Sequence, residues 1–311
     1  MSKIIVTGGA GFIGSNLVDR LIADGQEVLV IDNLSSGKKS YLNPLAKFSK
    51  LDIRSSKIER IFKNFKPDYV FHLAAQIDVR ISVDNPQLDT DINVLGGLNI
   101  LEACRQNKVK KIIFSSTGGA IYGETEEIPT SEVAPVYPLS PYGINKLTFE
   151  KYLNYYYQVY KLNYSILRFA NVYGPRQFKG GEAGVIAIFV DNAVKGLISR
   201  QFGDGLQTRD FIFVGDVVEA LIKAKEIDCR GEINIGLGQE VNLKEVQIAI
   251  SEALGESVQI KEEPAKLGEQ RRSCLSCERA RTVLNWEPKV NLKNGIKQTI
   301  TWAKKQQTLK Y

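Results

Sequence analysis

A glycine-rich turn directly after a short apolar strand restricts the possible folds of this chain more than any other feature. Residues 3–7 read Lys-Ile-Ile-Val-Thr, and glycines follow at positions 8, 11 and 14. Apolar residues then recur at helical spacing until Gly25, and a second apolar run ends at Asp32. Glycines at this spacing allow a tight turn and bring the backbone N–H groups at the start of a helix close to a pyrophosphate. The stretch therefore predicts a dinucleotide-binding strand–helix–strand unit.

The acidic residue at the end of the second run indicates which dinucleotide is bound. A carboxylate at Asp32 binds adenosine ribose hydroxyls and repels a 2′-phosphate, and no arginine follows it directly. We therefore expect NAD rather than NADP. Asp52 and Ile53, after a short strand, are placed to meet the adenine, and the small Ala74 and Ala75 after the buried run 68–73 allow the cofactor to approach closely.

Length, charge and cysteine content narrow the class of protein. A chain of 311 residues can bury one large core or two closely packed units, and no stretch is apolar enough to cross a bilayer. The first strand begins at Lys3, so we expect no cleavable signal before the fold. The four cysteines show no secreted framework, which predicts a cytoplasmic protein. The net charge of +6 suits anionic small molecules but is too diffuse to indicate nucleic acid.

The single histidine, His72, limits the possible chemistry. It excludes a Ser-His-Asp site and histidine-rich metal catalysis, so proton transfer must use tyrosine, lysine, a carboxyl group or a hydroxyl. Cys274 and Cys277 have the spacing of zinc ligands, but a structural zinc site needs four. We therefore expect no metal.

Alternating apolar runs and helical patterns predict an α/β fold with a Rossmann-like, doubly wound parallel sheet over residues 1–170. Further strands are expected near 48–53, 68–75, 110–117 and 165–170, with helices at 57–65, 89–107 and 142–161. Residues 171–311 predict a smaller, mixed α/β substrate domain with helices at 185–195, 216–226, 243–254 and 292–304. We expect 209–230 to return to the first domain, with Asp210 to Val214 as a strand of its sheet.

Tyr142 and Lys146 are four residues apart in a predicted helix and therefore share one face. Beside NAD, a cation about 5 Å from the phenol would favour phenolate by roughly 3 kcal/mol at an effective dielectric constant of about 20. Such a tyrosine can act as a base near neutral pH. The alternative is an ordinary surface pair, but Pro141 and the hydroxyl groups at 115–117 favour the functional interpretation.

The helix at 142–161 carries more apolar and tyrosine side chains than one buried stripe requires. A helix wholly buried within one subunit is the alternative, but it suits so many tyrosine hydroxyls poorly. We therefore expect a homodimer that is joined through this helix and the one at 89–107.

Seven motifs give the chain a specific resemblance that covers nearly its whole length. They are TGGAGFIG at 7–14, DNLSSG at 32–37, HLAA at 72–75, SSTGGAIYGE at 115–124, SPYGINK at 140–146, RFANVYGPR at 168–176 and FGDGLQTRDFIFVGDV at 202–217. In this order they resemble the extended short-chain dehydrogenase/reductases of the NAD-dependent epimerase/dehydratase family. The most similar members are the UDP-glucose (UDP-galactose) 4-epimerases.

The resemblance implies roles for individual residues. Tyr142 would be the base, Lys146 would bind the nicotinamide ribose, and a hydroxyl at Ser116 or Thr117 would polarise the sugar C4 oxygen. We favour Thr117, although the stretch before Tyr122 is one residue longer than the common pattern and places Gly118 at the usual spacing. The implied NAD-binding residues are Gly8, Gly11, Phe12, Ile13, Gly14, Asp32, Asn33, Ser35, Ser36, Gly37, Asp52, Ile53, Leu73, Ala74, Ala75, Gln76, Asn93, Ser115, Tyr142, Lys146 and Phe169.

The resemblance also implies contacts to a UDP-sugar substrate, with two departures from the family pattern. Lys266 and Glu269 stand where R-x-G-D is usual, and lysine lacks the two-pronged guanidinium that suits a phosphate. Ser273, four residues beyond Glu269, matches a position that lines the sugar pocket. The implied substrate-binding residues are Thr117, Asn171, Val185, Phe202, Arg209, Lys266, Glu269 and Ser273.

The expected reaction is NAD-dependent 4-epimerisation of a UDP-hexose through a transient 4-keto sugar. UDP-glucose and UDP-galactose are the first candidates, and the N-acetyl forms would fit beside a small residue such as Ser273. The resembling 4,6-dehydratases and decarboxylases are alternatives, but they need acid or base groups where this chain has Gly118, Gly119 and Ala120. An NAD-binding sensor without catalytic activity is an alternative of a different class, and the intact Thr117, Tyr142 and Lys146 argue against it.

Overall fold

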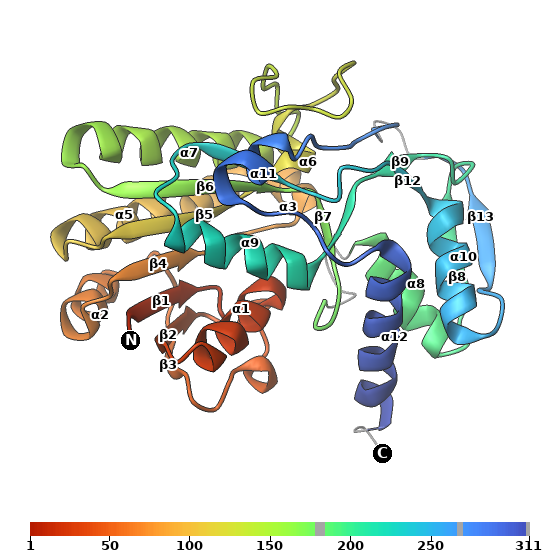
Figure 1. The fold of residues 1–311 in the computed structure, drawn as a ribbon, viewed down its shortest axis with the longest axis horizontal. Coiled ribbons are helices and arrows are strands. Elements are labelled where there is room, and N and C mark those ends of the chain that lie inside the picture. Colours follow the sequence, from red (N-terminus) through yellow and green to blue (C-terminus); the bar gives the residue numbers. More distant parts are fainter. Residues whose placement is uncertain (178–183, 266–269, 309–311) are drawn as a thin grey trace.

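The architecture is that of a doubly wound parallel sheet, as predicted. The structure is a computed structural model that describes residues 1–177, 184–265 and 270–308. Within these residues, a seven-stranded parallel sheet has the order β11-β6-β5-β4-β1-β2-β3 (Figure 1). Its strands are β1 (Lys3–Thr7), β2 (Glu27–Asp32), β3 (Lys47–Lys50), β4 (Tyr69–His72), β5 (Lys111–Thr117), β6 (Asn163–Phe169) and β11 (Glu232–Ile235). The strand order reverses between β1 and β4, and open α/β sheets bind ligands at such a point.

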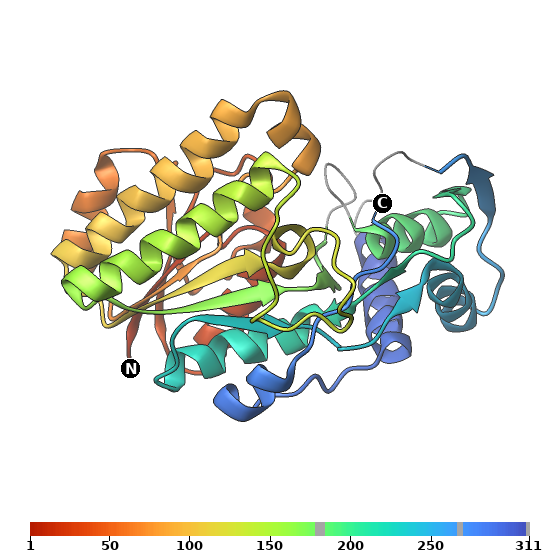
Figure 2. The ribbon, with the colours of Figure 1, turned by 90° about the horizontal axis from the view of Figure 1, so that it is seen from above.

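Helices cover both faces of this sheet, which explains why its strands are nearly continuous apolar runs. On one face, α1 (Phe12–Ala23), α9 (Val214–Glu226) and α11 (Glu278–Leu284) enclose a core with Leu17, Leu21 and Leu221. On the other, α2 (Lys57–Phe65), α5 (Gly96–Gln106) and α7 (Pro141–Tyr160) enclose a second core, and Figure 2 shows α5 and α7 side by side. The short η1 (Lys39–Tyr41) and α6 (Gly118–Ile121) follow β2 and β5.

The helix expected at 89–107 is divided by a π-helical turn. It follows α3 (Val79–Asp84) and consists of α4 (Pro86–Thr90), the π turn η2 (Asp91–Leu95) and then α5, with helical backbone angles at the junctions. Such turns often occur near functional sites. This one contains Asn93, a predicted cofactor-binding residue.

Most of the chain after β6, apart from α9, β11 and α11, forms a separate layer at one end of the sheet (Figure 2). Helices α8 (Val185–Val194), α10 (Leu243–Leu254) and α12 (Leu292–Thr308) share a third core with β7 (Asn171–Tyr173) and β10 (Phe211–Phe213). Three two-stranded sheets also occur in the described ranges: β7 with β10, β9 (Thr208–Arg209) with β12 (Val241–Asn242), and β8 (Ser199–Phe202) with β13 (Ile260–Glu263). Among the helices that the structure describes, none could span a membrane.

The expectation that Asp210 to Val214 forms a strand of the main sheet is wrong. Residues Phe211–Phe213 pair with β7 instead. The following helix, α9, packs on α1, β5 and β6, so the helix is the element that brings the chain back to the sheet. The next strand, β11, then pairs with β6 and becomes the seventh strand.

Candidate active site

A cavity of about 490 Å³ opens at the carboxyl ends of β1, β2, β4 and β5. Nearly all of the predicted cofactor-binding residues line it, although residues far apart in sequence supply them. Gly37 and Asn93 lie outside the lining. The predicted residues that line the cavity are Gly8, Gly11, Phe12, Ile13, Gly14, Asp32, Asn33, Ser35, Ser36, Asp52, Ile53, Leu73, Ala74, Ala75, Gln76, Ser115, Ser116, Tyr142, Lys146 and Phe169.

The turn between β1 and α1 has the shape of a phosphate cradle. Gly8 has φ +71°, and a Cβ atom there would lie 2.7 Å from the backbone nitrogen of Ala74. A Cβ on Gly14 would lie 2.2 Å from the carbonyl oxygen of Gly8. No side chain caps the N-terminus of α1 in the described structure, so its first N–H groups face the turn without a side-chain acceptor. These features fit the pyrophosphate of a dinucleotide.

Asp32 lies at the end of β2 with its carboxylate held in place by backbone groups. One oxygen accepts a hydrogen bond from the Ala10 N–H at 3.0 Å, and the other accepts one from the Leu34 N–H at 2.8 Å. Gly37 packs beside it, since a Cβ on Gly37 would lie 3.0 Å from Asp32 Oδ1. The carboxylate is therefore fixed at the rim of the cavity, as ribose recognition requires.

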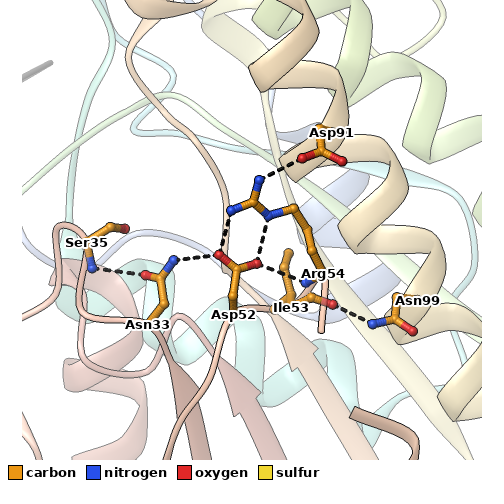
Figure 3. Close-up of polar contacts among 7 residues, drawn as sticks. All are labelled: Asn33, Ser35, Asp52, Ile53, Arg54, Asp91 and Asn99. Atoms are coloured by element: carbon orange, nitrogen blue, oxygen red, sulfur yellow. Dashed lines mark hydrogen bonds and ion pairs between the residues drawn. The ribbon is translucent and has the colours of Figure 1, made fainter. Parts of the chain in front are cut away.

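A cluster of polar side chains surrounds Asp52 at the predicted adenine end (Figure 3). Arg54 donates from Nε and Nη2 to the two oxygens of Asp52, at 2.9 and 2.8 Å, and Asn33 Nδ2 donates to Oδ2 at 3.1 Å. Arg54 also donates from Nη1 to Asp91 Oδ2 at 2.6 Å. The paired Arg54 guanidinium holds the pKa of Asp52 well below its usual range. The cluster thus joins the segment after β3 to the π turn.

Sequence reasoning missed Arg54. Its signal was a basic residue two positions after the predicted adenine-binding carboxylate, but the partner Asp91 is distant in sequence. Asn99 Nδ2 holds the same segment from α5, where it donates to the carbonyl oxygen of Ile53 at 2.6 Å (Figure 3). It also donates to the carbonyl oxygen of Ser55 at 2.9 Å. The loop that presents Ile53 is therefore anchored by side chains from two helical elements.

Tyr142 and Lys146 also line the cavity, and they come together on the first turns of α7. Ser140 caps this helix by accepting a hydrogen bond from the Gly143 N–H at 3.2 Å, and Pro141 occupies its first position. Lys146 Nζ lies 5.8 Å from the centre of the Tyr142 ring and donates to the Ser115 carbonyl oxygen at 2.9 Å. The helix and the end of β5 are thus joined at the predicted catalytic pair.

Lys146 is almost completely buried, with 4% of its surface exposed. Burial lowers the pKa of its ammonium group to about 8, and the negative charges of Asp89 and Glu150 oppose this shift. His72 lies nearby on β4 with Nδ1 2.7 Å from Thr7 Oγ1, and burial together with the Lys146 charge lowers its pKa to about 3. His72 is therefore neutral at physiological pH, which leaves the basic chemistry to tyrosine and lysine.

The two candidate hydroxyls at the end of β5 have different surroundings. Ser116 is buried, and its Oγ donates to Glu150 Oε1 at 2.6 Å. Thr117 is half-buried, lies outside the residues that line the cavity, and makes no side-chain capping bond to the helix that follows it. Successive side chains of a strand point to opposite faces, so the two hydroxyls have different neighbours. Ser116 is committed to Glu150.

A second buried hydrogen-bond network holds the loop that follows β4 and contains Gln76. Asn93 Oδ1 accepts from the Gln76 N–H and its Nδ2 donates to the Gln76 carbonyl oxygen, both at 2.9 Å. Asp89, fully buried, accepts from the side chains of Gln76, Asn93 and Asn145 at 2.7–3.0 Å. Asn145 directly precedes Lys146. Asn93 therefore positions the cavity wall, and Asp89 ties that wall to α7, a role that no local sequence signal indicated.

None of the predicted substrate residues that the structure describes belongs to the lining of this cavity. Asn171 begins β7, Val185 begins α8, Phe202 ends β8 and Arg209 ends β9. Lys266 and Glu269 lie outside the described residues. Asn171 is connected to the residue after Arg209, because its N–H donates to the Asp210 carbonyl oxygen at 2.9 Å.

Ser273 is half-buried in a segment that contacts both the predicted substrate residues and the end of β5. The Thr208 N–H donates to the Arg271 carbonyl oxygen at 3.0 Å, which places this segment beside β9. The carboxylate of Asp210 accepts from the Leu275 N–H at 3.3 Å, and Leu275 packs on Gly118. A chain of contacts therefore runs from Arg209 to the residue after Thr117.

The cysteine pair does not resemble a metal site. Cys274 and Cys277 are both buried, burial raises the pKa of each thiol to about 12, and Cys277 Sγ donates to the Gly236 carbonyl oxygen at 3.3 Å. Within the described ranges, no group of three or more His, Cys, Asp or Glu residues could hold a metal ion.

Comparisons with known proteins agree with this geometry. A family model described as the NAD dependent epimerase/dehydratase family matches residues 4–236. The UDP-glucose 4-epimerase of Mycolicibacterium smegmatis is 45% identical over 304 residues, which cover 96% of this chain and 97% of that protein. The solved UDP-glucose 4-epimerase of Thermotoga maritima with UDP-glucose is 46% identical, with a TM-score of 0.95 and 99% of each chain covered. That of Thermus thermophilus, in complex with NAD, is 43% identical, with a TM-score of 0.91, covering 97% of this chain and 98% of that one.

Proposed function

This chain belongs to the NAD dependent epimerase/dehydratase family and is an isomerase of the UDP-glucose 4-epimerase type, and we propose that it inverts C4 of a UDP-hexose through a transient 4-keto sugar. The observation that carries the proposal is the pairing of Tyr142 with a buried Lys146, next to the end of β5, in a cavity whose turn and Asp32 fit NAD. A tyrosine and lysine paired in this way can support oxidation of a sugar hydroxyl only when a hydride acceptor is bound next to them.

Each residue has a part in the proposed reaction. The Lys146 ammonium favours the phenolate of Tyr142, which removes the proton of the C4 hydroxyl. When bound, NAD supplies a reversible acceptor for the C4 hydride. Thr117 donates a hydrogen bond to the C4 oxygen, since Ser116 is already bonded to Glu150. After the sugar has turned over, Tyr142 returns the proton to the C4 oxygen, and the configuration at C4 is inverted.

Anchoring of the nucleotide keeps the sugar in the site while it turns. We assign the UDP moiety to residues 171–311, with Asn171 and Arg209 at the diphosphate, and Val185, Phe202, Lys266 and Glu269 around it. Residues 1–170 form the NAD-binding domain in this division, with α9 packed on its sheet. Binding energy from the non-reacting diphosphate would thus hold the 4-keto sugar until reduction is complete.

The decisive experiment is incubation of the purified protein with UDP-glucose, UDP-galactose, UDP-N-acetylglucosamine and UDP-N-acetylgalactosamine, followed by separation of the products. The expected products are the 4-epimers alone. A 4-keto-6-deoxy sugar from these substrates would indicate a dehydratase, and loss of CO₂ from added UDP-glucuronate would indicate a decarboxylase. Retained NAD without any turnover would indicate a binding protein and contradict the proposal.

Ser273 bears on the choice of sugar. A small side chain at this position leaves space for a 2-acetamido group, so we expect both UDP-hexoses and UDP-N-acetylhexosamines as substrates. Ser273→Tyr should remove turnover of the N-acetyl substrates selectively, through steric exclusion. Equal effects on both substrate types, or no effect on either, would show that Ser273 does not line the sugar pocket.

The exposed side of α7 fits a homodimer. Ile144, Tyr155 and Val159 recur at helical spacing and are 50%, 48% and 52% exposed, and Leu95 lies on the neighbouring helical layer at 55%. Val159→Glu should convert the dimer to a monomer in light scattering at micromolar concentration, whereas Ile248→Glu on α10 should not.

We expect the protein to be located in the cytoplasm, because all four cysteines are free thiols.

A further inference from the structure

A buried ion pair lies behind the catalytic end of β5. Glu150 stands on α7 one turn after Lys146, and Arg168 stands on β6. Their side chains are 0% and 3% exposed. Arg168 donates from Nε and Nη2 to the two carboxylate oxygens of Glu150, at 3.0 and 2.6 Å. The pair is therefore fixed in a bidentate geometry, away from solvent.

Glu150 and Arg168 each also bind one end of the segment 116–122, which follows directly on Ser115 of β5. Ser116 Oγ donates to Glu150 Oε1 at 2.6 Å. Arg168 Nη1 donates to the hydroxyl oxygen of Tyr122 at 3.0 Å, and that hydroxyl donates to Asn234 Oδ1 on β11 at 2.8 Å. Between these two contacts lie only Thr117 and the single helical turn α6.

The segment between the contacts has little stiffness of its own. Thr117 is followed by Gly118 and Gly119, and glycine leaves the backbone the most conformational freedom. Gly118 is confined from outside, because a Cβ there would lie 2.5 Å from Leu275 Cδ1. The place of the Thr117 hydroxyl therefore depends on the contacts at the two ends of the segment, together with the packing of Leu275 on Gly118.

We propose that Glu150 and Arg168 are positioning residues that hold Ser116 and Tyr122 and thereby place the Thr117 hydroxyl opposite Tyr142. The proposal rests on the epimerase function proposed above. A buried ion pair gives little net stability over an apolar pair, so its retention is better explained by the geometry that it specifies.

The test removes one contact and leaves the ion pair in place, because loss of either charged partner would strongly destabilise the fold. Tyr122→Phe deletes only the hydroxyl that Arg168 holds. A matched control is Tyr164→Phe, a buried tyrosine on β6 whose hydroxyl bonds to Asn154 at 3.5 Å. We expect Tyr122→Phe to lower kcat about tenfold, the value of one hydrogen bond to a charged group, with KM and melting temperature as in the control.

A double-mutant cycle separates positioning from general structural damage. If Tyr122 acts through the Thr117 hydroxyl, Tyr122→Phe will lower kcat in the unaltered protein but not in a Thr117→Val background. Long incubation times allow kcat of the slow variants to be measured. The same fold loss in both backgrounds would overturn the inference while leaving the epimerase function intact. Absence of UDP-hexose turnover in the unaltered protein would instead overturn the function, and the inference with it.

Arg168→Lys supplies an independent check. Lysine keeps the charge but has no planar fork, so it cannot bond to both carboxylate oxygens of Glu150 and to Tyr122 at once. We expect a fall in kcat similar to that of Tyr122→Phe, again absent in the Thr117→Val background. A normal kcat for Arg168→Lys would contradict the proposed role.

Discussion

The two ends of the cofactor cavity use ion pairs in different environments. At the adenine end, the side chains of Asp52 and Arg54 are 29% and 36% exposed, and water and salt screen their attraction. At the catalytic end, Lys146, Glu150 and Arg168 are buried, and desolvation alone is sufficient to shift the pKa of Lys146. Similar charges hold a loop at the adenine end, and in the proposed mechanism they set the reactivity of Tyr142 at the other end. It also predicts that single substitutions will differ greatly in effect between the ends.

The largest effect is expected at the catalytic end, for Tyr142→Phe. Loss of the phenolic oxygen should lower turnover of UDP-galactose about a thousandfold, within the range for loss of a general base, while bound NAD is retained. Separation of products and the NAD content of the purified variant measure the two effects. Tyr152→Phe, on the same helix, is the control and should be unaffected. Near-normal turnover by the Tyr142 variant would remove this residue from the mechanism.

An intermediate effect is expected from pH, again at the buried end. The folded-state pKa of Lys146 is lowered to about 8, so its ammonium form is present below pH 8 and is lost as pH rises through that value. The groups that face it are Asp89 and Glu150, which raise its pKa, the Tyr142 phenol, whose ring centre is 5.8 Å away, and His72, which is neutral. We therefore expect kcat/KM to fall on an alkaline limb with a midpoint near pH 8.

Lys146→Arg provides the control for this limb, because arginine stays protonated across the accessible range. Its activity should be lower throughout, since the shape differs, but the limb near pH 8 should be absent. Lys146→Ala should weaken both NAD binding and rate. If kcat/KM of the arginine variant still falls near pH 8, the titrating group is not Lys146.

The smallest effect is expected at the exposed end, for Arg54→Ala. Loss of an exposed ion pair should weaken NAD binding only about fivefold, and the difference should shrink in high salt. The rate at which bound NAD is lost on dilution measures it, with Arg60→Ala on α2 as a matched exposed arginine. An effect as large as that of a catalytic-end substitution would show that exposure does not govern the difference between the two ends.

Local patterns sufficed for much of the fold and the cavity. The βαβ start, Asp32 and the Tyr142–Lys146 pair depend on contacts within a turn or a helix, and the lining of the cavity contains nearly all of the predicted cofactor positions. The π turn was not predicted, because a helical period of 3.6 residues fits 89–107 almost as well without it. The segment Asp210 to Val214 was wrongly predicted as a strand of the main sheet. The strand that pairs with β6 is β11, and its position depends on how α9 packs, which cannot be read from a short stretch of sequence.

The Glu150–Arg168 pair could not be predicted either, because it depends on contacts between residues that are far apart in the sequence. Glu150 follows Lys146 by four residues and so shares its helix face, but a glutamate in a helix is ordinarily a solvent-exposed residue. Its burial depends on Arg168 on a strand and on Ser116 and Tyr122, which no sequence spacing relates to it. Thr117 and the predicted substrate residues likewise remain predictions, because they lie outside the cavity lining.

The position of β11 in the sheet has a consequence for synthesis of the chain on the ribosome. Residues 170–231 separate β6 from β11, and these two strands are neighbours in the sheet. Until residue 235 has left the ribosome, β6 is an edge strand with unpaired backbone groups and a largely buried apolar sequence. Nascent chains that stop between these points therefore present this unpaired edge, and a chaperone that binds strand edges would act in that interval.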